Sequence, residues 1–291
     1  MKALRKSVIL LFCQLLLISS ASANTTTTIT LASQTSATQL ISQRANFVAA
    51  RNALRQGKNK RFRKLAKGLT DYPLYPYLEY WDINRNLKTT SAEKINVFLQ
   101  RNSDIPSSKR LKNRWLKQLA KQGKWRQLVV NYSPTSNTEL ECYYRRGLYK
   151  NGNKTAALDD LEKLWLVGKS QPRACDPLFT TWQDGGHLTS ELAWQRIVLA
   201  LNNGEVYLAR YLEKFLNKQQ RQWSEVWRDI HRHPEKALKH KRLQQDIAIV
   251  RTILAHGVRR MARNNPSKAA QMWDKLVMEF SFSETDRKSV V

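Results

Sequence analysis

Apolar residues recur along this chain at the spacing of one face of an α-helix. The full pattern i, i+3, i+4, i+7 occurs in six separate stretches and places four side chains on one side of two helical turns. The stretches are Phe62, Leu65, Ala66, Leu69; Trp125, Leu128, Val129, Tyr132; Trp194, Ile197, Val198, Leu201; Leu208, Tyr211, Leu212, Phe215; Trp223, Val226, Trp227, Ile230; and Trp273, Leu276, Val277, Phe280. No stretch shows the sustained alternation typical of a β-strand. The sequence predicts an all-α fold.

Short turns separate the predicted helices. Glycines stand where helices should end, and prolines stand where they should begin. At 151–153, 203–205 and 265–266 a turn precedes small residues and then large apolar ones one and two turns later. Helical repeats stack in this way. Because the units are irregularly spaced, we expect an irregular α-superhelix, a solenoid of short helix pairs, rather than a closed bundle.

The first 23 residues have the composition of a secretory signal peptide. Lys2, Arg5 and Lys6 precede an apolar run from Val8 to Ile18, and Ala21-Ser22-Ala23 is a small-x-small cleavage pattern. The run is too short for a membrane anchor, which needs about 20 apolar residues. We therefore predict export to the periplasm, cleavage after about Ala23, and no transmembrane segment in the mature chain.

The two ends of the mature chain differ from its middle. Residues 24–36 are rich in Thr and Ser and carry no charge, which predicts a flexible N-terminus ahead of a superhelical domain over 37–291. At the other end, Trp273 to Phe280 presents an apolar face followed only by Ser281 to Val291. That tail could be a minimal cap, but we favour a superhelix that is incomplete at its C-terminal end.

Two cysteines remain once the signal peptide is removed, since Cys13 lies within the apolar run. In a reducing cytosol Cys142 and Cys175 would usually be buried thiols. In an oxidising compartment they have one possible intramolecular pairing. Given export, we predict a Cys142–Cys175 disulfide.

The formal charge is +27, and the mature chain without the three basic leader residues would carry +24. Such a surface attracts polyanions. Nucleic acid would be the first candidate in the cytosol, but export removes it and leaves carboxylate-rich peptidoglycan, anionic membrane surfaces or acidic proteins. Many individual Lys and Arg residues are expected to be ordinary solvated positions.

Candidate catalytic and metal-binding groups are few. His231, His233 and His240 form the single histidine cluster, and we interpret them as exposed residues at a helix end before Pro234 rather than as metal ligands. Phosphate-binding loops, nucleophile elbows and zinc motifs are absent from the sequence. Glu79, set among aromatic residues, is expected to pair with Arg or Lys rather than to catalyse. We predict no catalytic, cofactor-binding or metal site.

Two strings of unusual composition carry a resemblance to a known family. They are Asp71-Tyr72-Pro73-Leu74-Tyr75-Pro76-Tyr77-Leu78-Glu79-Tyr80, and Leu164-Trp165-Leu166-Val167-Gly168-Lys169-Ser170-Gln171-Pro172 with Ala174-Cys175-Asp176 and Leu178-Phe179. The first predicts an extended connector whose tyrosines pack between helices or contact glycan. From about Ala45 onward the chain resembles the N-terminal superhelical region of the periplasmic soluble lytic murein transglycosylases.

The resemblance implies a ring-like or U-shaped superhelix joined to a lysozyme-like domain that cleaves peptidoglycan to anhydromuramoyl ends. The family's catalytic Glu-Ser and Gly-Leu-Met-Gln strings do not occur in this sequence. We therefore expect a superhelix truncated before the ring is complete, and no lytic activity from the 291 residues alone.

Three functions compete at this point. The leading hypothesis is the superhelical portion of a lytic transglycosylase that binds murein without the catalytic domain. The alternative is a helical-repeat scaffold that docks periplasmic protein partners. A weaker third reading is a poorly folding remnant with a bare apolar face.

Overall fold

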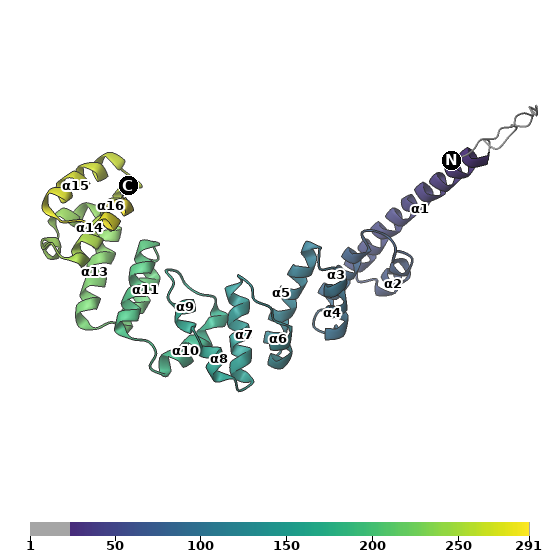
Figure 1. Ribbon diagram of the computed structural model, residues 1–291, viewed down its shortest axis with the longest axis horizontal. Helices are drawn as coiled ribbons and strands as arrows, with labels where there is room; N and C mark the ends of the chain where they lie inside the picture. Colours follow the sequence, from purple (N-terminus) through teal and green to yellow (C-terminus); the bar gives the residue numbers. More distant parts are fainter. Residues whose placement is uncertain (1–23, 291) are drawn as a thin grey trace, which may run out of the picture. The chain divides into compact units, whose positions relative to one another are not determined.

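The computed structural model describes residues 24–290, so the predicted signal peptide lies outside the described residues. Within this range all regular structure is helical and no strand occurs (Figure 1). The chain divides into two compact units, one ending at Lys112 and the other beginning at Asn113. The prediction of an all-α solenoid of short helices is confirmed.

The first unit is built around one long helix. It contains α1 (Asn24–Arg55), α2 (Asn59–Lys67), α3 (Tyr75–Arg85) and α4 (Ala92–Arg101), and α5 (Pro106–Lys121) contains the boundary between the units. Helix α1 packs on α2 and α3. Since α1 begins at Asn24, the Thr- and Ser-rich segment 24–36 is helical, which its composition did not suggest. The flexibility of that segment stays a prediction.

The Tyr- and Pro-rich string packs between helices of the first unit. The Phe47 ring lies 5.5 Å from the Tyr72 ring and 6.1 Å from the Trp81 ring, measured between centroids. The prediction of an extended connector was wrong. Backbone hydrogen bonds from Tyr72 to Leu69 and from Tyr75 to Tyr72 fold the connector into consecutive turns instead.

The second unit is a succession of short helices that contact their neighbours in sequence. Pairs such as α6–α7, α11–α12, α13–α14 and α14–α15 pack on one another, as in a repeat array. The elements are α6 (Trp125–Asn131), α7 (Thr138–Lys150), α8 (Lys154–Leu158), α9 (Leu161–Trp165), η1 (Arg173–Cys175), α10 (Asp176–Asp184), α11 (Ser190–Asn202), α12 (Val206–Leu212), η2 (Glu213–Phe215), α13 (Lys218–Arg232), η3 (Pro234–Lys239), η4 (Lys241–Leu243), α14 (Ala248–Ala262), α15 (Pro266–Glu279) and α16 (Glu284–Val290).

The predicted turn signals operate as helix boundaries. Asn153 caps α8 by accepting a hydrogen bond from the Ala156 amide, and Asn265 caps α15 through the Lys268 amide. Gly204 ends α11 with a φ of +81°, a conformation that side-chain-bearing residues rarely adopt. The short turns explain why successive helices pack on each other.

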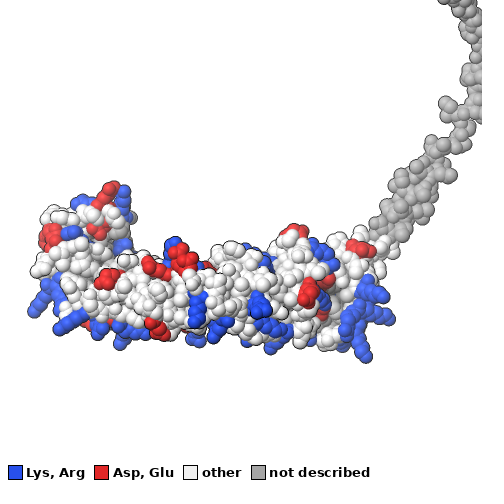
Figure 2. Space-filling view, turned by 60° about the horizontal axis from the view of Figure 1, so that its bottom comes forward, with Lys and Arg blue, Asp and Glu red and all other residues white. Residues whose placement is uncertain are grey.

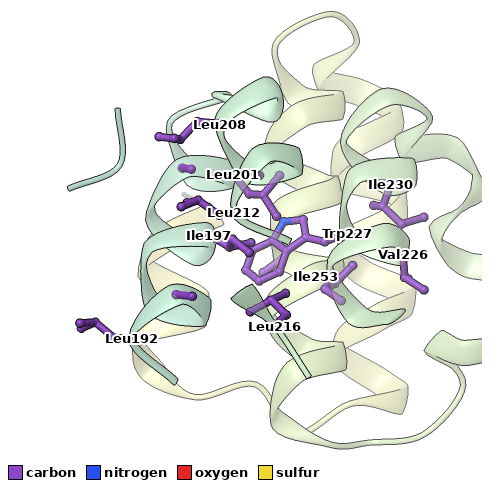
Figure 3. Packing of buried hydrophobic residues seen from close by; sticks show 14 of the residues in the cluster. Leu192, Ile197, Leu201, Leu208, Leu212, Leu216, Val226, Trp227, Ile230 and Ile253 are labelled. Atoms are coloured by element: carbon purple, nitrogen blue, oxygen red, sulfur yellow. The ribbon is translucent and has the colours of Figure 1, made fainter. Parts of the chain in front are cut away.

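Trp227 is one of the largest fully buried side chains of the second unit. Its side chain is fully buried among apolar residues of α11 to α14, including Ile197, Leu212 and Ile253 (Figure 3). Removal of a buried aromatic ring costs about 3–5 kcal/mol. One side chain therefore joins four helices that lie in sequence order.

The end of the described chain covers the apolar face of α15. Phe282 is buried, and its ring lies 4.7 Å from that of Trp273. Helix α16 packs on α14. The expectation of a bare face from Trp273 to Phe280 was wrong for these residues, because Phe282 returns the chain onto the helix. The incomplete C-terminal end of the superhelix stays a prediction.

Candidate functional site

A pocket of about 430 Å³ lies among α9, α10, α11 and α12. We call it the Trp165 pocket. Several of its lining residues belong to the second of the two unusual sequence strings. Its lining combines aromatic rings with hydrogen-bonding groups: Trp165, Ser170, Gln171, Asp176, Phe179, Thr180, Gln183, Arg196, Tyr207, Leu208 and Tyr211. Ligand sites typically pair apolar surface with a few polar groups in this way.

Arg196 is the buried charge of the pocket. Only 5% of the residue is exposed, and the guanidinium carbon lies 4.4 Å from the centroid of the Trp165 ring. Its Nε donates a hydrogen bond to the Val167 carbonyl at 3.2 Å, and its Nη2 donates to the Lys169 carbonyl at 3.4 Å. Burial lowers its pKa to about 10, so it is still charged at neutral pH.

No carboxylate in the described part of the chain forms an ion pair with Arg196. Its charge is offset by the Trp165 ring and two backbone carbonyls. A buried charge without an opposite charge is costly. A bound acceptor, whether a hydroxyl or a carboxylate, would lower that cost.

The loop from Leu166 to Pro172 owes its shape to close contacts with α11. A Cβ atom on Gly168 would lie 2.5 Å from the Leu199 carbonyl oxygen. Asn203 Nδ2 donates to the Gly168 carbonyl at 3.1 Å, and Gln171 Nε2 donates to the Leu164 carbonyl at 2.6 Å. Glycine is therefore needed at 168, because a larger residue would push the loop off α11.

A disulfide holds the far end of the same loop. Cys142 on α7 and Cys175 in η1 are bonded, as the sequence predicts, with their Cα atoms 4.9 Å apart. Both cysteines are fully buried. Helix α10 begins directly after Cys175, and Pro177 is its second residue. The disulfide thus fixes where α10, and with it Phe179, meets the pocket.

Two exposed tyrosines form the rim of the Trp165 pocket. Tyr207 is 88% exposed and Tyr211 is 56% exposed, and they lie one turn apart on α12. Lys214 Nζ lies 4.1 Å from the centroid of the Tyr211 ring. Aromatic side chains of this size usually bury most of their surface, so exposed rings beside a pocket indicate a surface available for stacking.

The pocket has the chemistry of binding rather than of glycoside cleavage. Its acid, Asp176, is exposed at the start of α10. Glycoside cleavage requires an acid in an apolar setting, whereas the Asp176 side chain is exposed to solvent. Glu79, the other acid considered from the sequence, pairs with Arg101, as predicted.

Comparisons with known proteins gave a match to a family model and several matches to lytic transglycosylases. The family model, that of the Cucumovirus coat protein, matches residues 117–241, which is less than half of the chain, so it does not establish the family of this chain. The soluble lytic murein transglycosylase of Escherichia coli K12 is 33% identical over 186 residues, which cover 63% of this chain and 29% of that protein. The Salmonella typhimurium LT2 protein of the same name is 37% identical over 151 residues, covering 51% and 23%.

Solved structures extend the match. The lytic transglycosylase Slt of Pseudomonas aeruginosa has a TM-score of 0.70 at 34% identity, over 84% of this chain and 40% of that one. The 70 kDa soluble lytic transglycosylase of Escherichia coli has a TM-score of 0.72 at 27% identity, over 86% and 41%. This chain is therefore similar to the soluble lytic murein transglycosylases in both sequence and fold. It spans less than a third of the length of the curated relatives it matches.

The resemblance to soluble lytic transglycosylases drawn from the two strings is therefore confirmed. One string builds the aromatic packing of the first unit, and the other builds the Trp165 pocket. The sequence did not predict that pocket, because Arg196, Tyr207 and Tyr211 lie outside the strings. The apolar pattern placed Tyr211 on a packed helix face with Leu208 and Leu212, whereas the structure leaves Tyr211 56% exposed at the rim of the pocket.

The interpretation of the histidine cluster was partly wrong. His233 is exposed at the end of α13 as expected, but His231 is only 6% exposed. Its Nδ1 lies 3.0 Å from Nε2 of His256 on α14, a residue that no sequence motif singled out. Among residues 24–290, no group of three or more potential metal ligands occurs. No helix in that range is both long enough and apolar enough to cross a bilayer.

Proposed function

We propose that this chain is the superhelical portion of a periplasmic soluble lytic transglycosylase and that it binds peptidoglycan through the Trp165 pocket. The observation that carries the proposal is the pairing of a buried, charged Arg196 with the exposed rings of Tyr207 and Tyr211. Peptidoglycan has sugar faces, on which the Tyr207 and Tyr211 rings would stack. It also has hydroxyl and carboxylate oxygens, which would accept hydrogen bonds from Arg196.

The charge of the chain supports a polyanionic ligand. Lys and Arg side chains are spread over the helices of the face in Figure 2 rather than gathered in one patch. Helix α2 and the residue before it add exposed basic side chains: Lys58, Lys60, Arg61, Arg63, Lys64 and Lys67. A broad positive field raises the local concentration of an anionic polymer. The pocket would then supply the directed contacts.

Binding to purified sacculi tests the pocket directly. We expect Tyr207→Ala and Tyr211→Ala each to weaken binding about 2- to 12-fold, because loss of one stacking contact costs about 0.5–1.5 kcal/mol. Both residues are exposed, so the fold should be unaffected. Met278→Ala, which removes another highly exposed apolar side chain of the second unit, is the matched control. Equal binding by all three variants would refute the pocket as the glycan site.

Salt separates the proposal from the alternative of a scaffold for periplasmic proteins. Sacculus binding that falls sharply between low and moderate ionic strength supports the polyanion reading. Capture of one periplasmic protein that is insensitive to salt, together with no sacculus binding, supports the scaffold.

Export and inactivity are separate parts of the proposal. Mass spectrometry of the periplasmic protein should give a chain beginning at about Asn24. Purified chain incubated with sacculi should release no anhydromuropeptides, because the sequence has no Glu-Ser string. Release of such products would overturn the expectation that these 291 residues alone do not cleave the glycan strand.

A further inference from the structure

A second, smaller cavity lies among α11, α13 and α14. It has a volume of about 70 Å³, well above the ~10–15 Å³ that admits a single water molecule. Asn202 and Gly204 from the end of α11, His231 and His256 line it together with Arg259, Arg260 and Arg263. This space is large enough for a chemical group of several heavy atoms.

All the charged groups lining the cavity have the same sign. Arg259 and Arg260 lie in the last turn of α14, and Arg263 follows directly after it. Within residues 24–290, no carboxylate lines the cavity. Asp286 on α16 lies outside the lining and interacts electrostatically with Arg259, which partly offsets the lowering of that arginine's pKa by burial. Oδ2 of Asp286 accepts hydrogen bonds from the Ser283 amide and hydroxyl. The described lining of the cavity therefore supplies no opposite charge to the arginines, and Asp286 acts on Arg259 from outside that lining.

One of these arginines has an unused donor. Nη2 of Arg259 donates to Oδ1 of Asn202 at 2.9 Å. Nε of Arg259 is buried and has no hydrogen-bond partner in the part of the chain that the structure describes. Buried polar atoms are nearly always paired, so an unpaired guanidinium N–H beside a cavity indicates a missing acceptor.

The two histidines complete a ring of donors. The rings of His231 and His256 stack with centroids 5.1 Å apart, and the pair shares one hydrogen bond. Burial, together with the neighbouring arginines, lowers the pKa of His231 to about 4 and that of His256 to about 3. Both are neutral at pH 7. In either tautomer of the hydrogen-bonded pair, one N–H remains for another acceptor.

We propose that this cavity binds a small oxyanion, a phosphate or carboxylate group, held by the three arginines and the histidine pair. The oxyanion would accept from Nε of Arg259 and offset the repulsion among the arginines. Arginine forks match the geometry of both groups. The site is distinct from the Trp165 pocket, and the proposal does not depend on glycan binding there.

Titration of the full-length mature chain with inorganic phosphate, followed by NMR of the histidine ring protons, tests the proposal. The imidazole signals of His231 and His256 should shift in a saturable manner at pH 7, whereas those of exposed His187 and His233 should not. A parallel titration with acetate distinguishes the source. Tighter phosphate binding points to a phosphoryl ligand, and tighter acetate binding points to a carboxylate such as that of a cell-wall peptide.

Arg263 is exposed, so its variant should keep the fold intact, whereas Arg260 is half-buried and its Nε donates to the His231 carbonyl at 3.4 Å. Arg263→Gln and Arg260→Gln should each weaken phosphate or acetate binding about tenfold. Arg210→Gln, which removes an exposed charge on α12 outside the cavity, is the matched control and should bind as the wild type does. The proposal is overturned if neither anion shifts the signals beyond sodium chloride of equal ionic strength. Equal weakening by Arg210→Gln and Arg263→Gln would also overturn it.

Discussion

Arg196 and Trp165 form a buried cation–π pair, with the guanidinium carbon 4.4 Å from the ring centroid. Trp165 is the last residue of α9 and Arg196 lies in α11, so their contact holds these two helices together. The loop from Leu166 to Pro172 follows directly after Trp165. Arg196 also donates hydrogen bonds to the Val167 and Lys169 carbonyls of this loop. One side chain thus positions the loop and supplies charge to the pocket.

Replacement of Arg196 by Ala should lower the free energy of unfolding by about 2–4 kcal/mol, because it removes the cation–π contact and leaves two carbonyls without donors. Urea denaturation measures this. Arg210→Ala, at an exposed position, should change stability by no more than about 0.5 kcal/mol. Similar stabilities for the two variants would mean that Arg196 is not structural.

Loss of the disulfide should destabilise the second unit. Cys142 and Cys175 are separated by 33 residues, and closing a loop of that length stabilises a fold by about 3–4 kcal/mol in the chain-entropy estimate. Thermal unfolding of Cys142→Ala/Cys175→Ala should show a correspondingly lower midpoint. Reducing agent should lower the midpoint of the wild type but leave the double variant unchanged. An equal effect of reductant on both proteins would contradict the role of this bond.

Acid should destabilise the fold through the histidine pair. The pKa values of His231 and His256 in the folded protein, about 4 and about 3, lie below the ordinary 6.5. The unfolded chain therefore binds protons first as pH falls, and the stability contributed by neutral histidines is lost from about pH 6.5 downward. Each pKa unit corresponds to about 1.4 kcal/mol, so the total loss reaches several kcal/mol by pH 3.

A pH series of urea denaturation with one variant tests this assignment. His256→Gln should reduce the slope of stability against pH between 6.5 and 4, because one titrating group is gone. His187→Gln, at an exposed position, should keep the wild-type slope. If His256→Gln retains the full slope, other groups cause the acid sensitivity.

Gly168→Ala should distort the pocket. The added Cβ would lie 2.5 Å from the Leu199 carbonyl oxygen and would also clash with Nδ2 of Asn203. The backbone of Leu199 cannot move aside as easily as a side chain can. We expect a loss of about 1–3 kcal/mol in thermal or urea denaturation. Gly68→Ala, where the nearest atom is 3.9 Å from the new Cβ, is the control. Equal stability of the two variants would show that the loop can move away from α11.

Helices could be predicted from this sequence because their signals are local. Apolar spacing and the caps at Asn153 and Asn265 depend on residues within two turns. Boundaries are less exact: Thr90 and Glu93 have the spacing of a capping box, but Ser91 caps α4 by accepting a hydrogen bond from the Lys94 amide. A shift of one residue is typical of such signals.

Neither candidate site could be predicted from local sequence patterns, because folding brings together residues that are distant in the sequence. Arg196 reaches back 29 residues to Val167, and His256 meets His231 across 25 residues. In the sequence His256 is one polar residue in an apolar helix, and Gly168 could as well have been a helix end. The disulfide was predictable because, if the chain is exported as predicted, its two remaining cysteines have a single possible pairing.

The stacking of each helix on its sequence neighbours has a consequence for evolution and engineering. The Trp165 pocket draws its lining from residues 165–211, and the oxyanion cavity draws its lining from residues 202–263. Each candidate site is thus encoded by a short, nearly continuous piece of gene. Insertion, exchange or loss of a few helices can alter one specificity and leave the other intact, which is difficult in proteins whose sites combine residues from opposite ends of the chain.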